Sequence, residues 1–400
     1  MFQKKTVRDV SLSGRRALVR VDFNVPLKDG QVADDTRIQA ALPTLEYMME
    51  HGASLVLCSH LGRPKGQVVP GLSLRPVAVH LSNLIGKQVA FVDDCVGDQA
   101  LRAAQALEPG DVLLLENTRF HPEERKNDPG FAAQLASLGE LFVNDAFGSA
   151  HRAHASTEGV THHLPAVAGF LMEKELNYLG QALAEPSRPF LAILGGAKIS
   201  DKIEVVESLL KQADKLLVGG GMANTFLAAQ GMDMASSLVE EQAKEVALDL
   251  LGKAKGRLLL PVDVVVAEEF AADAAHRVVD PGEVPSGWQV LDIGPRTVET
   301  FRLAMKDAAM LFWNGPMGVF EFPAFAEGTR EIAKAVAESQ ATTIVCGGDS
   351  VAAVRQEGYA DRIDHVSTGG GASLEFLVGK PLPGVEALLD REAPADKPAA

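Results

Sequence analysis

Cationic and hydrogen-bonding side chains follow four short apolar runs in the first half of the sequence, at 17–21, 54–58, 112–115 and 141–143. Guanidinium groups pair bidentately with phosphate and carboxylate, so several of them at one place would suit a small phosphorylated acid. The cations that follow these runs are Arg37, His60, Arg63, Arg119 and Arg152. Asp22 and Asn24 are suited to hydrogen bonds with a hydroxyl of the same acid. A single such arginine is more simply explained as a solvated surface charge. Polar or cationic residues after all four runs favour a binding site.

The second half repeats a different unit, in which an apolar run leads through a glycine cluster into a helical pattern. Its four instances are FLAILGG before AKISDK, KLLVGGG before MANTF, TTIVCGG before DSVAAV and HVSTGGG before ASLEF. Glycines at such a junction let a phosphate approach the backbone, and the helix start offers N–H groups with partial positive charge. One glycine pair indicates only a tight turn, whereas four on neighbouring strands predict a nucleotide site. None fits a Walker or dinucleotide fingerprint, so this site would be of another kind.

Charged residues next to these glycines suggest roles around a phosphate chain. Lys198 and Lys202 are four apart, which predicts that both lie on one helix face near its start. Asp349 is placed to hold a hard cation such as Mg²⁺, with Ser350 capping the following helix. The alternative for Asp349 is that it is itself the cap. Glu321, after a turn that follows a buried run, is suited to a ribose hydroxyl or is a plain surface glutamate.

Near-continuous apolar runs predict the elements that would position these residues. Runs of this length suit strands covered on both faces, hence a parallel sheet whose ligands gather at the carboxyl ends of the strands. A chain of 400 residues is expected to form two domains. Between the halves, apolar residues at helical spacing and flanking prolines predict a helix within 164–189. The predicted fold class is α/β, with two doubly wound parallel-sheet (Rossmann-like) domains joined by a helical linker or hinge; the alternative is a surface helix in one large domain.

The expected boundaries follow from these patterns. We place an acid-binding domain at 1–170, the linker helix at 171–186 and a nucleotide-binding domain at 187–379. The last residues, 391–400, are rich in alanine, proline and charge, and we expect a disordered tail there.

The composition narrows the class of partner. Hydrophobic residues make up 46% and charged residues 23% of the chain, as in globular proteins, and the formal charge is −15. This charge argues against nucleic acid or an anionic membrane surface as partner. Cys58, Cys95 and Cys346 are scattered without metal-type spacing, so neither a disulfide framework nor a zinc site is indicated. With no apolar leader or membrane-length run, we expect a cytoplasmic protein.

Nine motifs together resemble the phosphoglycerate kinase family, in the right order over roughly residues 2–390. They are RVDFNVP (20–26), SHLGRP (59–64), ENTRF (116–120), AHRAHAS (150–156), LGGAKISDK (194–202), GGGMANTF (219–226), WNGPMGVFE (313–321), GGDS (347–350) and STGGGAS (367–373). The compact EERKNDPG segment is similar to the bacterial branch. No motif residue is replaced.

The resemblance implies a set of site residues and partners. For 3-phosphoglycerate it implies Asp22, Phe23, Asn24, Arg37, His60, Leu61, Gly62, Arg63, Arg119 and Arg152. For the nucleotide it implies Lys202, Gly220, Glu321, Gly347, Gly348, Asp349 and Ser350, with Asp349 on Mg²⁺. It also implies a monomer, and a segment at about 380–390 that folds back on the N-terminal domain.

The implied reaction is reversible, Mg²⁺-dependent phosphoryl transfer between 1,3-bisphosphoglycerate with ADP and 3-phosphoglycerate with ATP, in glycolysis and gluconeogenesis. The acceptor carboxylate is already ionised at neutral pH, so no general base is needed. We expect Arg37 and Lys198 to contact the transferring group, Lys202 the nucleotide phosphates, and the helix start at Gly370 to add N–H donors. In-line transfer would follow closure of the two domains about the linker. The alternatives are a kinase for another carboxylate, or a silent scaffold that kept both pockets.

Overall fold

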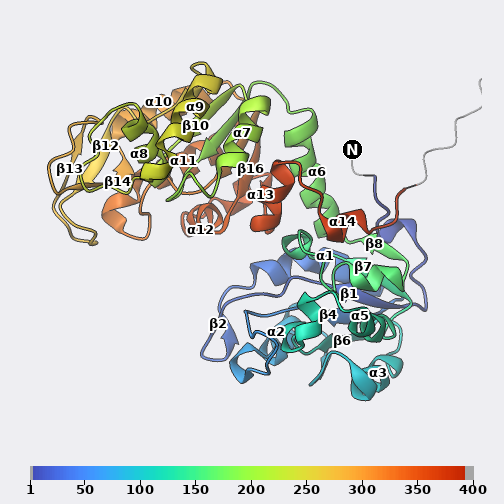
Figure 1. Cartoon of the computed structure of the whole chain (residues 1–400). Coiled ribbons are helices and arrows are strands. Elements are labelled where there is room, and N and C mark those ends of the chain that lie inside the picture. The colour runs from blue at the N-terminus through green and yellow to red at the C-terminus, as the bar shows by residue number, and fades with distance from the viewer. Residues whose placement is uncertain (1–2, 392–400) are drawn as a thin grey trace, which may run out of the picture. The chain divides into compact units, whose positions relative to one another are not determined.

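The computed structural model describes residues 3–391 and contains two compact units (Figure 1). Unit 1 is Met1–Asn177 with Lys380–Ala400, and unit 2 is Tyr178–Gly379. The predicted disordered tail at 391–400 falls outside the described residues except for Arg391. Among the residues described, no helix is both long and apolar enough to cross a bilayer.

Unit 1 is built on a six-stranded sheet in the order β5-β6-β4-β1-β7-β8, and all of its strand pairs are parallel. The strands are β1 (Arg16–Arg20), β4 (Ser54–Cys58), β5 (Val89–Val92), β6 (Val112–Leu115), β7 (Leu141–Asn144) and β8 (Ala166–Ala168). The predicted apolar runs are therefore strands, and the parallel sheet is confirmed. Their burial on both faces explains the runs: every residue of β4, β6 and β7 is buried.

The helices of unit 1 begin and end where local chemistry favours it. They are α1 (Thr36–Glu50), α2 (Arg75–Ile85), α3 (Gly97–Gln105), α4 (Pro122–Arg125), α5 (Pro129–Ala136) and, near the C-terminus, α14 (Pro383–Glu386). In α5 the Asp128 carboxylate accepts the N–H of Phe131 at 2.9 Å, and Pro129 occupies the first turn. Gly86 ends α2 in the left-handed conformation that glycine tolerates. A two-stranded hairpin, β2 (Leu27–Lys28) with β3 (Gln31–Val32), precedes α1.

The C-terminal segment packs on unit 1 beside the N-terminus. Lys4 forms an ion pair with Asp390 at 2.8 Å, and the Asn144 amide donates to the Gly384 carbonyl at 3.0 Å. Arg391 pairs with Asp9 at 3.1 Å.

Unit 2 has a second parallel sheet in the order β11-β10-β9-β15-β16-β17. Its strands are β9 (Phe190–Leu194), β10 (Lys215–Val218), β11 (Leu258–Leu259), β15 (Met310–Asn314), β16 (Thr342–Cys346) and β17 (His365–Val366). The chain winds outward from β9 in one direction and from β15 in the other, which is the doubly wound order. Beside it lies an antiparallel sheet of β13 (His276–Val279), β12 (Val264–Ala267) and β14 (Gln289–Ile293), which the sequence patterns did not predict.

The helices of unit 2 follow its strands. They are α7 (Ile203–Gln212), α8 (Gly220–Ala229), α9 (Lys244–Ala254), α10 (Pro295–Met305), α11 (Glu327–Glu338), α12 (Gly348–Gln356) and α13 (Gly371–Leu377). Three of the four predicted strand-glycine-helix units are present as such, at α8, α12 and α13. In the remaining one, FLAILGG before AKISDK, the glycines that follow β9 lead into a loop, and α7 begins only at Ile203.

One helix, α6 (Phe170–Ala184), spans the division between the units. It corresponds to the linker helix expected at 171–186. Its first turn is held by Asp145, whose Oδ1 accepts the N–H groups of Leu171 at 2.9 Å and Met172 at 3.1 Å. A carboxylate at this place satisfies donors that a helix start leaves unpaired.

Candidate active site

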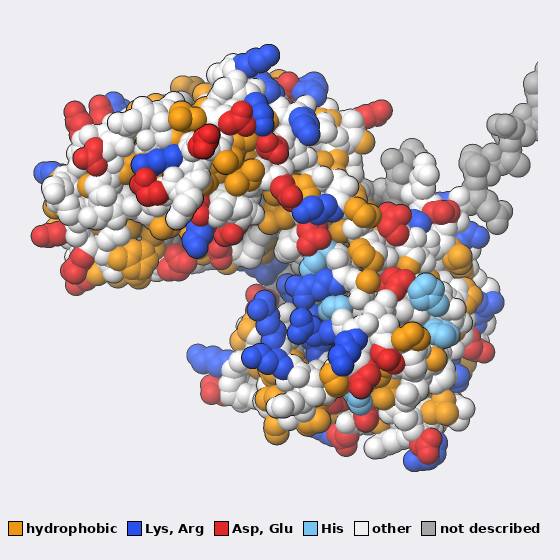
Figure 2. All heavy atoms as spheres, in the orientation of Figure 1, with side chains coloured by type: hydrophobic (Ala, Val, Ile, Leu, Met, Phe, Trp, Pro, Cys, Tyr) orange, Lys and Arg blue, Asp and Glu red, His pale blue; other side chains and the backbone are white. Residues whose placement is uncertain are grey.

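The carboxyl ends of β1, β4, β6 and β7 carry a concentration of positive charge on unit 1. Figure 2 shows Lys and Arg side chains gathered on this part of the surface, with histidines beside them. We call this group the cationic edge; its members are Arg20, Arg37, His60, Arg63, Arg119 and Arg152. The sheet brings them together because parallel strands all end at the same edge.

Arg37, in the first turn of α1, is held over the end of β1. Its Nη1 donates to both carboxylate oxygens of Asp22 at 3.2 Å and to the Asn24 carbonyl at 3.2 Å. The Asn24 side-chain oxygen accepts the Gly62 N–H at 2.8 Å, which ties the loop after β1 to the loop after β4. The Arg37 side chain keeps 32% of its surface exposed, so an anion from solvent has access to it.

Arg20 and His60 form the buried floor of the cationic edge. Arg20 is fully buried; its Nη2 lies 3.0 Å from His60 Nδ1, and its Nε donates to the Ser156 hydroxyl at 2.9 Å. Burial, together with the charges of Arg20 and Arg119, lowers the pKa of His60 well below its ordinary value. His60 is therefore neutral at physiological pH, and its ring can both donate and accept a hydrogen bond.

Arg119 follows β6, and its charge is only partly compensated. Its Nη1 donates to the Gly62 carbonyl at 3.0 Å, while its buried Nε has no hydrogen-bond partner among the residues that the structure describes. Burial, then the charges of Arg20 and Arg152, lower the pKa of Arg119 to about 10. Burial and these arginines, with Arg119 foremost, also lower the pKa of His154 to about 3. This edge of unit 1 thus has a positive potential that an anion would relieve.

Four further residues that the sequence implied for acid binding differ in whether their side chains are exposed to solvent. Phe23 and Leu61 are core residues, and their N–H groups already bond to Ser59 Oγ at 2.9 Å and Asn117 Oδ1 at 3.2 Å. They can shape the loops, but neither presents its side chain to solvent. Arg63 and Arg152 are exposed, and Arg152 Nε lies 2.9 Å from His151 Nε2.

Sequence reasoning missed the buried support of the cationic edge. Glu124 is fully buried and accepts from Ser156 twice, at 3.0 Å from the N–H and 2.5 Å from the hydroxyl. Ser156 thereby bridges the buried carboxylate to the buried guanidinium of Arg20. The signal that was available is an arginine inside a strand whose other residues are apolar, because a buried charge requires hydrogen-bonding partners.

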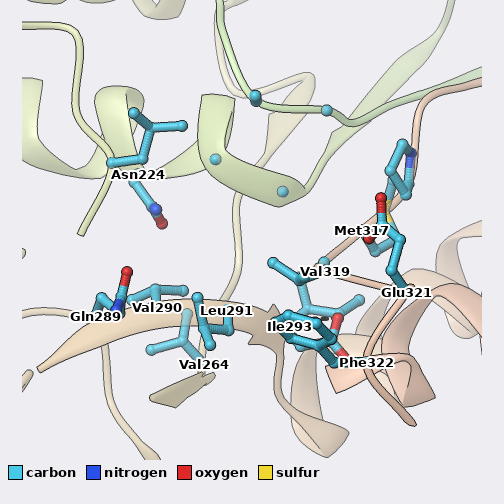
Figure 3. Close-up of a pocket in the computed structure, with 18 of the residues that line it drawn as sticks. Asn224, Val264, Gln289, Val290, Leu291, Ile293, Met317, Val319, Glu321 and Phe322 are labelled. Atoms are coloured by element: carbon cyan, nitrogen blue, oxygen red, sulfur yellow. Dashed lines mark hydrogen bonds between the residues drawn. The ribbon is translucent and has the colours of Figure 1, made fainter. Parts of the chain in front are cut away.

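Unit 2 contains a cavity of about 680 Å³ between the glycine-rich junctions and the antiparallel sheet. In Figure 3, Asn224 of α8 lies across from Gln289 and Val290 of β14, and Met317 and Glu321 lie at the other end. Much of the wall is apolar, which suits a nucleotide base, and its polar side chains include those of Asn224, Gln289 and Glu321. Of the predicted nucleotide-binding residues, Gly220, Glu321 and Asp349 line this cavity.

Close backbone packing explains why glycine occupies the junctions. Gly220 has φ +66°, and a Cβ there would lie 2.8 Å from backbone atoms of Gly196. At Gly347, with φ +90°, a Cβ would lie 2.7 Å from Nδ2 of Asn314. Gly370, with φ +53°, is the residue that precedes α13. Any larger residue at Gly220 would push apart loops that form the floor of the cavity.

The prediction that Lys198 and Lys202 share a helix face is wrong. Lys202 is the N-cap of α7 and Lys198 is an exposed residue of the preceding loop, because the helix begins only at Ile203. Lys202 Nζ donates to the carbonyls of Gly195 at 2.7 Å and Asn314 at 3.3 Å. Burial lowers the pKa of Lys202 to about 8, although Asp349 and Asp201 oppose this shift.

The predictions that Ser350 or Asp349 caps α12 are also wrong. The N-cap is Gly347, and α12 begins at Gly348, so Asp349 and Ser350 lie inside the first turn. The buried Ser350 hydroxyl instead accepts the Gly315 N–H at 2.5 Å and fixes the loop after β15. Asp349 is exposed, which leaves its carboxylate accessible to a cation.

Comparisons with known proteins agree with this architecture. A family model described as phosphoglycerate kinase matches residues 7–380. The chain is 61% identical over 391 residues to phosphoglycerate kinase of Moorella thermoacetica, covering 97% of this chain and 100% of that protein. It is also 61% identical over 400 residues to the same enzyme of Chloroflexus aurantiacus, covering 98% and 100%.

Solved structures give the same result at lower identity. The structure of phosphoglycerate kinase from Coxiella burnetii is 42% identical with a TM-score of 0.87, covering 96% of this chain and 98% of that one. The enzyme from Pyrococcus horikoshii is 34% identical with a TM-score of 0.85 over the same shares. The chain therefore belongs to the phosphoglycerate kinase family, whose glycolytic reaction is the reversible transfer of a phosphoryl group between 1,3-bisphosphoglycerate with ADP and 3-phosphoglycerate with ATP.

Proposed function

We propose that this kinase binds 3-phosphoglycerate or 1,3-bisphosphoglycerate at the cationic edge of unit 1, and Mg²⁺-bound ATP or ADP in the cavity of unit 2. The main support for acid binding at the cationic edge is the environment of Arg119. Its guanidinium is largely buried, its Nε has no hydrogen-bond partner among residues 3–391, and its pKa is lowered to about 10 by burial and neighbouring arginines. A phosphate or carboxylate at the solvent-facing part of this guanidinium would supply the missing negative charge.

The two ends of the acid would engage different members of the cationic edge. The exposed guanidinium groups of Arg63 and Arg152, with Arg119, suit the stable phosphate, which accepts bidentate hydrogen bonds. Asp22 and Asn24 suit the hydroxyl of the acid. We assign Arg37 to the transferring phosphoryl group, because its bonds to Asp22 are long and its side chain is partly exposed.

No side chain of unit 1 has to act as a general base in this scheme. The acceptor is a carboxylate whose pKa is about 3.5, so it is a competent nucleophile at neutral pH. The neutral ring of His60 is then a hydrogen-bonding group that positions the acid. Catalysis comes from alignment and from stabilising charge on the transferred group.

The nucleotide would lie along the cavity of unit 2, with its base, ribose and phosphates against different residues. The apolar wall of β14 and Met317 suits the base, and Glu321 the ribose. Gly220 leaves the backbone open to the phosphates, and a phosphate near Lys202 would raise the pKa that burial has lowered. We propose further contacts from Lys198 and from the backbone at Gly347, Gly348 and Gly370.

Mg²⁺ fits the residues that surround the expected phosphates. The ion usually binds through one or two carboxylates together with substrate phosphates and water. Asp349 provides one exposed carboxylate, which lines the same cavity as Gly220. When bound, the ion neutralises negative charge on the phosphate chain.

The two sites belong to different units, so transfer requires the reacting atoms of the two ligands to be brought together. We propose domain closure, with α6 in the hinge, followed by in-line transfer. Small-angle scattering tests this: compaction is expected with both ligands bound, and an unchanged radius would contradict it. We also propose a cytoplasmic monomer, and the three buried free cysteines agree with a reducing compartment.

A coupled assay that removes the acyl phosphate product tests the site directly. ATP consumption should require both Mg²⁺ and 3-phosphoglycerate, and other carboxylates without a second anionic group should not replace the acid. Arg119→Leu should raise the KM for the acid at least about tenfold, the value of a charge-assisted hydrogen bond, with little change for ATP. Arg102→Leu, an exposed arginine of α3, is the matched control. Equal KM for the acid in both variants would remove Arg119 from the site.

A further inference from the structure

One cluster of metal-ligating side chains lies outside both sites. Among the described residues, Asp94, Cys95 and His121 each offer one ligand atom, and the three atoms lie within 4.8 Å of one another. Asp94 and Cys95 follow β5, while His121 follows the short turn after β6. Because β5 and β6 are parallel neighbours, their carboxyl ends bring these loops together.

The three ligand atoms lie within reach of one metal ion, but one pair is closer than a tetrahedral site needs. His121 Nε2 lies 2.7 Å from Asp94 Oδ1, and the His121 ring is oriented by Phe131, with ring centroids 5.1 Å apart. Zinc bonds of about 2.0–2.3 Å would place the ligand atoms about 3.3–3.6 Å apart. A bound ion would therefore require the His121 imidazole and the Asp94 carboxylate to move apart by at least about 0.6 Å.

Access to the cluster is from one side. The side chains of Asp94 and His121 are 46% and 30% exposed, whereas Cys95 is buried. A cation can thus meet the carboxylate and imidazole at the surface and the sulfur beneath them. Three protein ligands leave the fourth tetrahedral position for water.

We propose that Asp94, Cys95 and His121 form a binding site for Zn²⁺ or a similar borderline divalent cation. Sulfur and nitrogen ligands select such ions, whereas Mg²⁺ takes oxygen ligands, so this site is distinct in chemistry from that proposed at Asp349. On binding, the Cys95 thiol loses its proton to solvent and the thiolate bonds the metal, while His121 binds as the neutral imidazole. Cysteine spacing did not indicate this site because its three ligands come from two loops that only the sheet brings together.

Cobalt absorption tests the proposal on the full-length protein after removal of metals by chelation. Co²⁺ should give a thiolate-to-metal charge-transfer band that saturates at one ion per chain and disappears when Zn²⁺, but not Mg²⁺, is added. The band should be absent in Cys95→Ser and intact in Cys346→Ser, a matched buried cysteine of unit 2. Asp94→Asn and His121→Gln, at partly exposed positions, should weaken Co²⁺ binding at least about tenfold.

The native protein alone can overturn the proposal, whether or not the cysteine variants fold. A native chain that shows no charge-transfer band does not use Cys95 as a metal ligand. A band that survives in Cys95→Ser, or Co²⁺ affinity unchanged in both Asp94→Asn and His121→Gln, would place the metal elsewhere.

Discussion

Asp145, which holds the first turn of α6, is expected to make unit 1 less stable as pH rises. Its carboxyl is fully buried and accepts two backbone N–H groups through Oδ1, whereas Oδ2 has no hydrogen-bond partner within the described part of the chain. Burial raises its pKa to about 6, against an ordinary value of 3.8, although the hydrogen bonds oppose this shift. Between these values the folded state binds more protons than the unfolded state, so the free energy of unfolding falls with increasing pH.

The size of the effect follows from the shift. At 1.36 kcal/mol per pKa unit, the deprotonated carboxylate costs about 3 kcal/mol above pH 6. The free energy of unfolding falls by about 1.4 kcal/mol of this amount between about pH 5 and pH 8. The rest is already lost below pH 5, because Asp145 in the unfolded state is largely deprotonated there. Asp145→Asn keeps an acceptor for Leu171 and Met172 but does not titrate. The native protein should therefore lose about 1.4 kcal/mol more than Asp145→Asn over this range.

Urea unfolding at several pH values measures this difference. Both tryptophans, Trp288 and Trp313, lie in unit 2, so their fluorescence follows that unit, while far-ultraviolet circular dichroism follows both. The difference should appear in the dichroism transition and be absent from the fluorescence transition. Asp98→Asn, an exposed carboxylate in the first turn of α3, should behave like the native protein. If Asp145→Asn has the same pH dependence as the native protein, the buried carboxylate is not the titrating group and the reasoning fails.

Three further predictions concern the reaction. Arg37→Ala should lower kcat at least about a hundredfold with little change in nucleotide affinity, if the main contact of Arg37 forms in the transition state. Equal losses in kcat and nucleotide affinity, or a similar loss of kcat in the control Arg102→Ala, would contradict this. The lowered pKa of Lys202 predicts that calorimetric ATP affinity falls between about pH 7 and pH 9 as its ammonium deprotonates, and that Lys202→Arg lacks this fall; parallel profiles would exclude Lys202. Gly220→Ala should lose ATP affinity and about 1–3 kcal/mol of stability, whereas Gly231→Ala, also at positive φ but with open space at its Cβ, should keep ATP affinity.

The strands could be predicted from the sequence because both sheets are buried on two faces. Runs such as 54–58 and 112–115 have no solvent face, so their composition alone identifies them. In the antiparallel sheet of unit 2, β13 gives no apolar run because three of its four residues are exposed. β12 and β14 contain no exposed residue, so the apolar run Val264–Ala267 was available in the sequence and was overlooked. The contribution of β14 to the cavity wall was missed with it.

The gathering of the proposed acid-binding residues at the strand ends could be predicted from the sequence, but the buried groups that support them could not. Arg37, His60 and Arg119 lie where the parallel-sheet rule puts ligand-binding groups. The bridge from Arg20 through Ser156 to Glu124 joins three segments far apart in the sequence, and no spacing rule encodes it. The error at Lys198 and Lys202 has a local cause, since a loop of eight residues, 195–202, separates β9 from α7.

Buried hydrogen-bonding groups hold the side chains of the cationic edge in place. Like charges brought together at one edge repel, and the lowered pKa values of His60, His154 and Arg119 record that repulsion together with the cost of burial. The fully buried Glu124 opposes it through Ser156, but Glu124 is too deep to occupy the place of a ligand. An anion that arrives at the surface thus meets groups already in position and gains electrostatic energy without reorganising them. If the acid binds at the cationic edge as proposed, that preorganisation is the main contribution of unit 1, because the carboxylate nucleophile needs no activation.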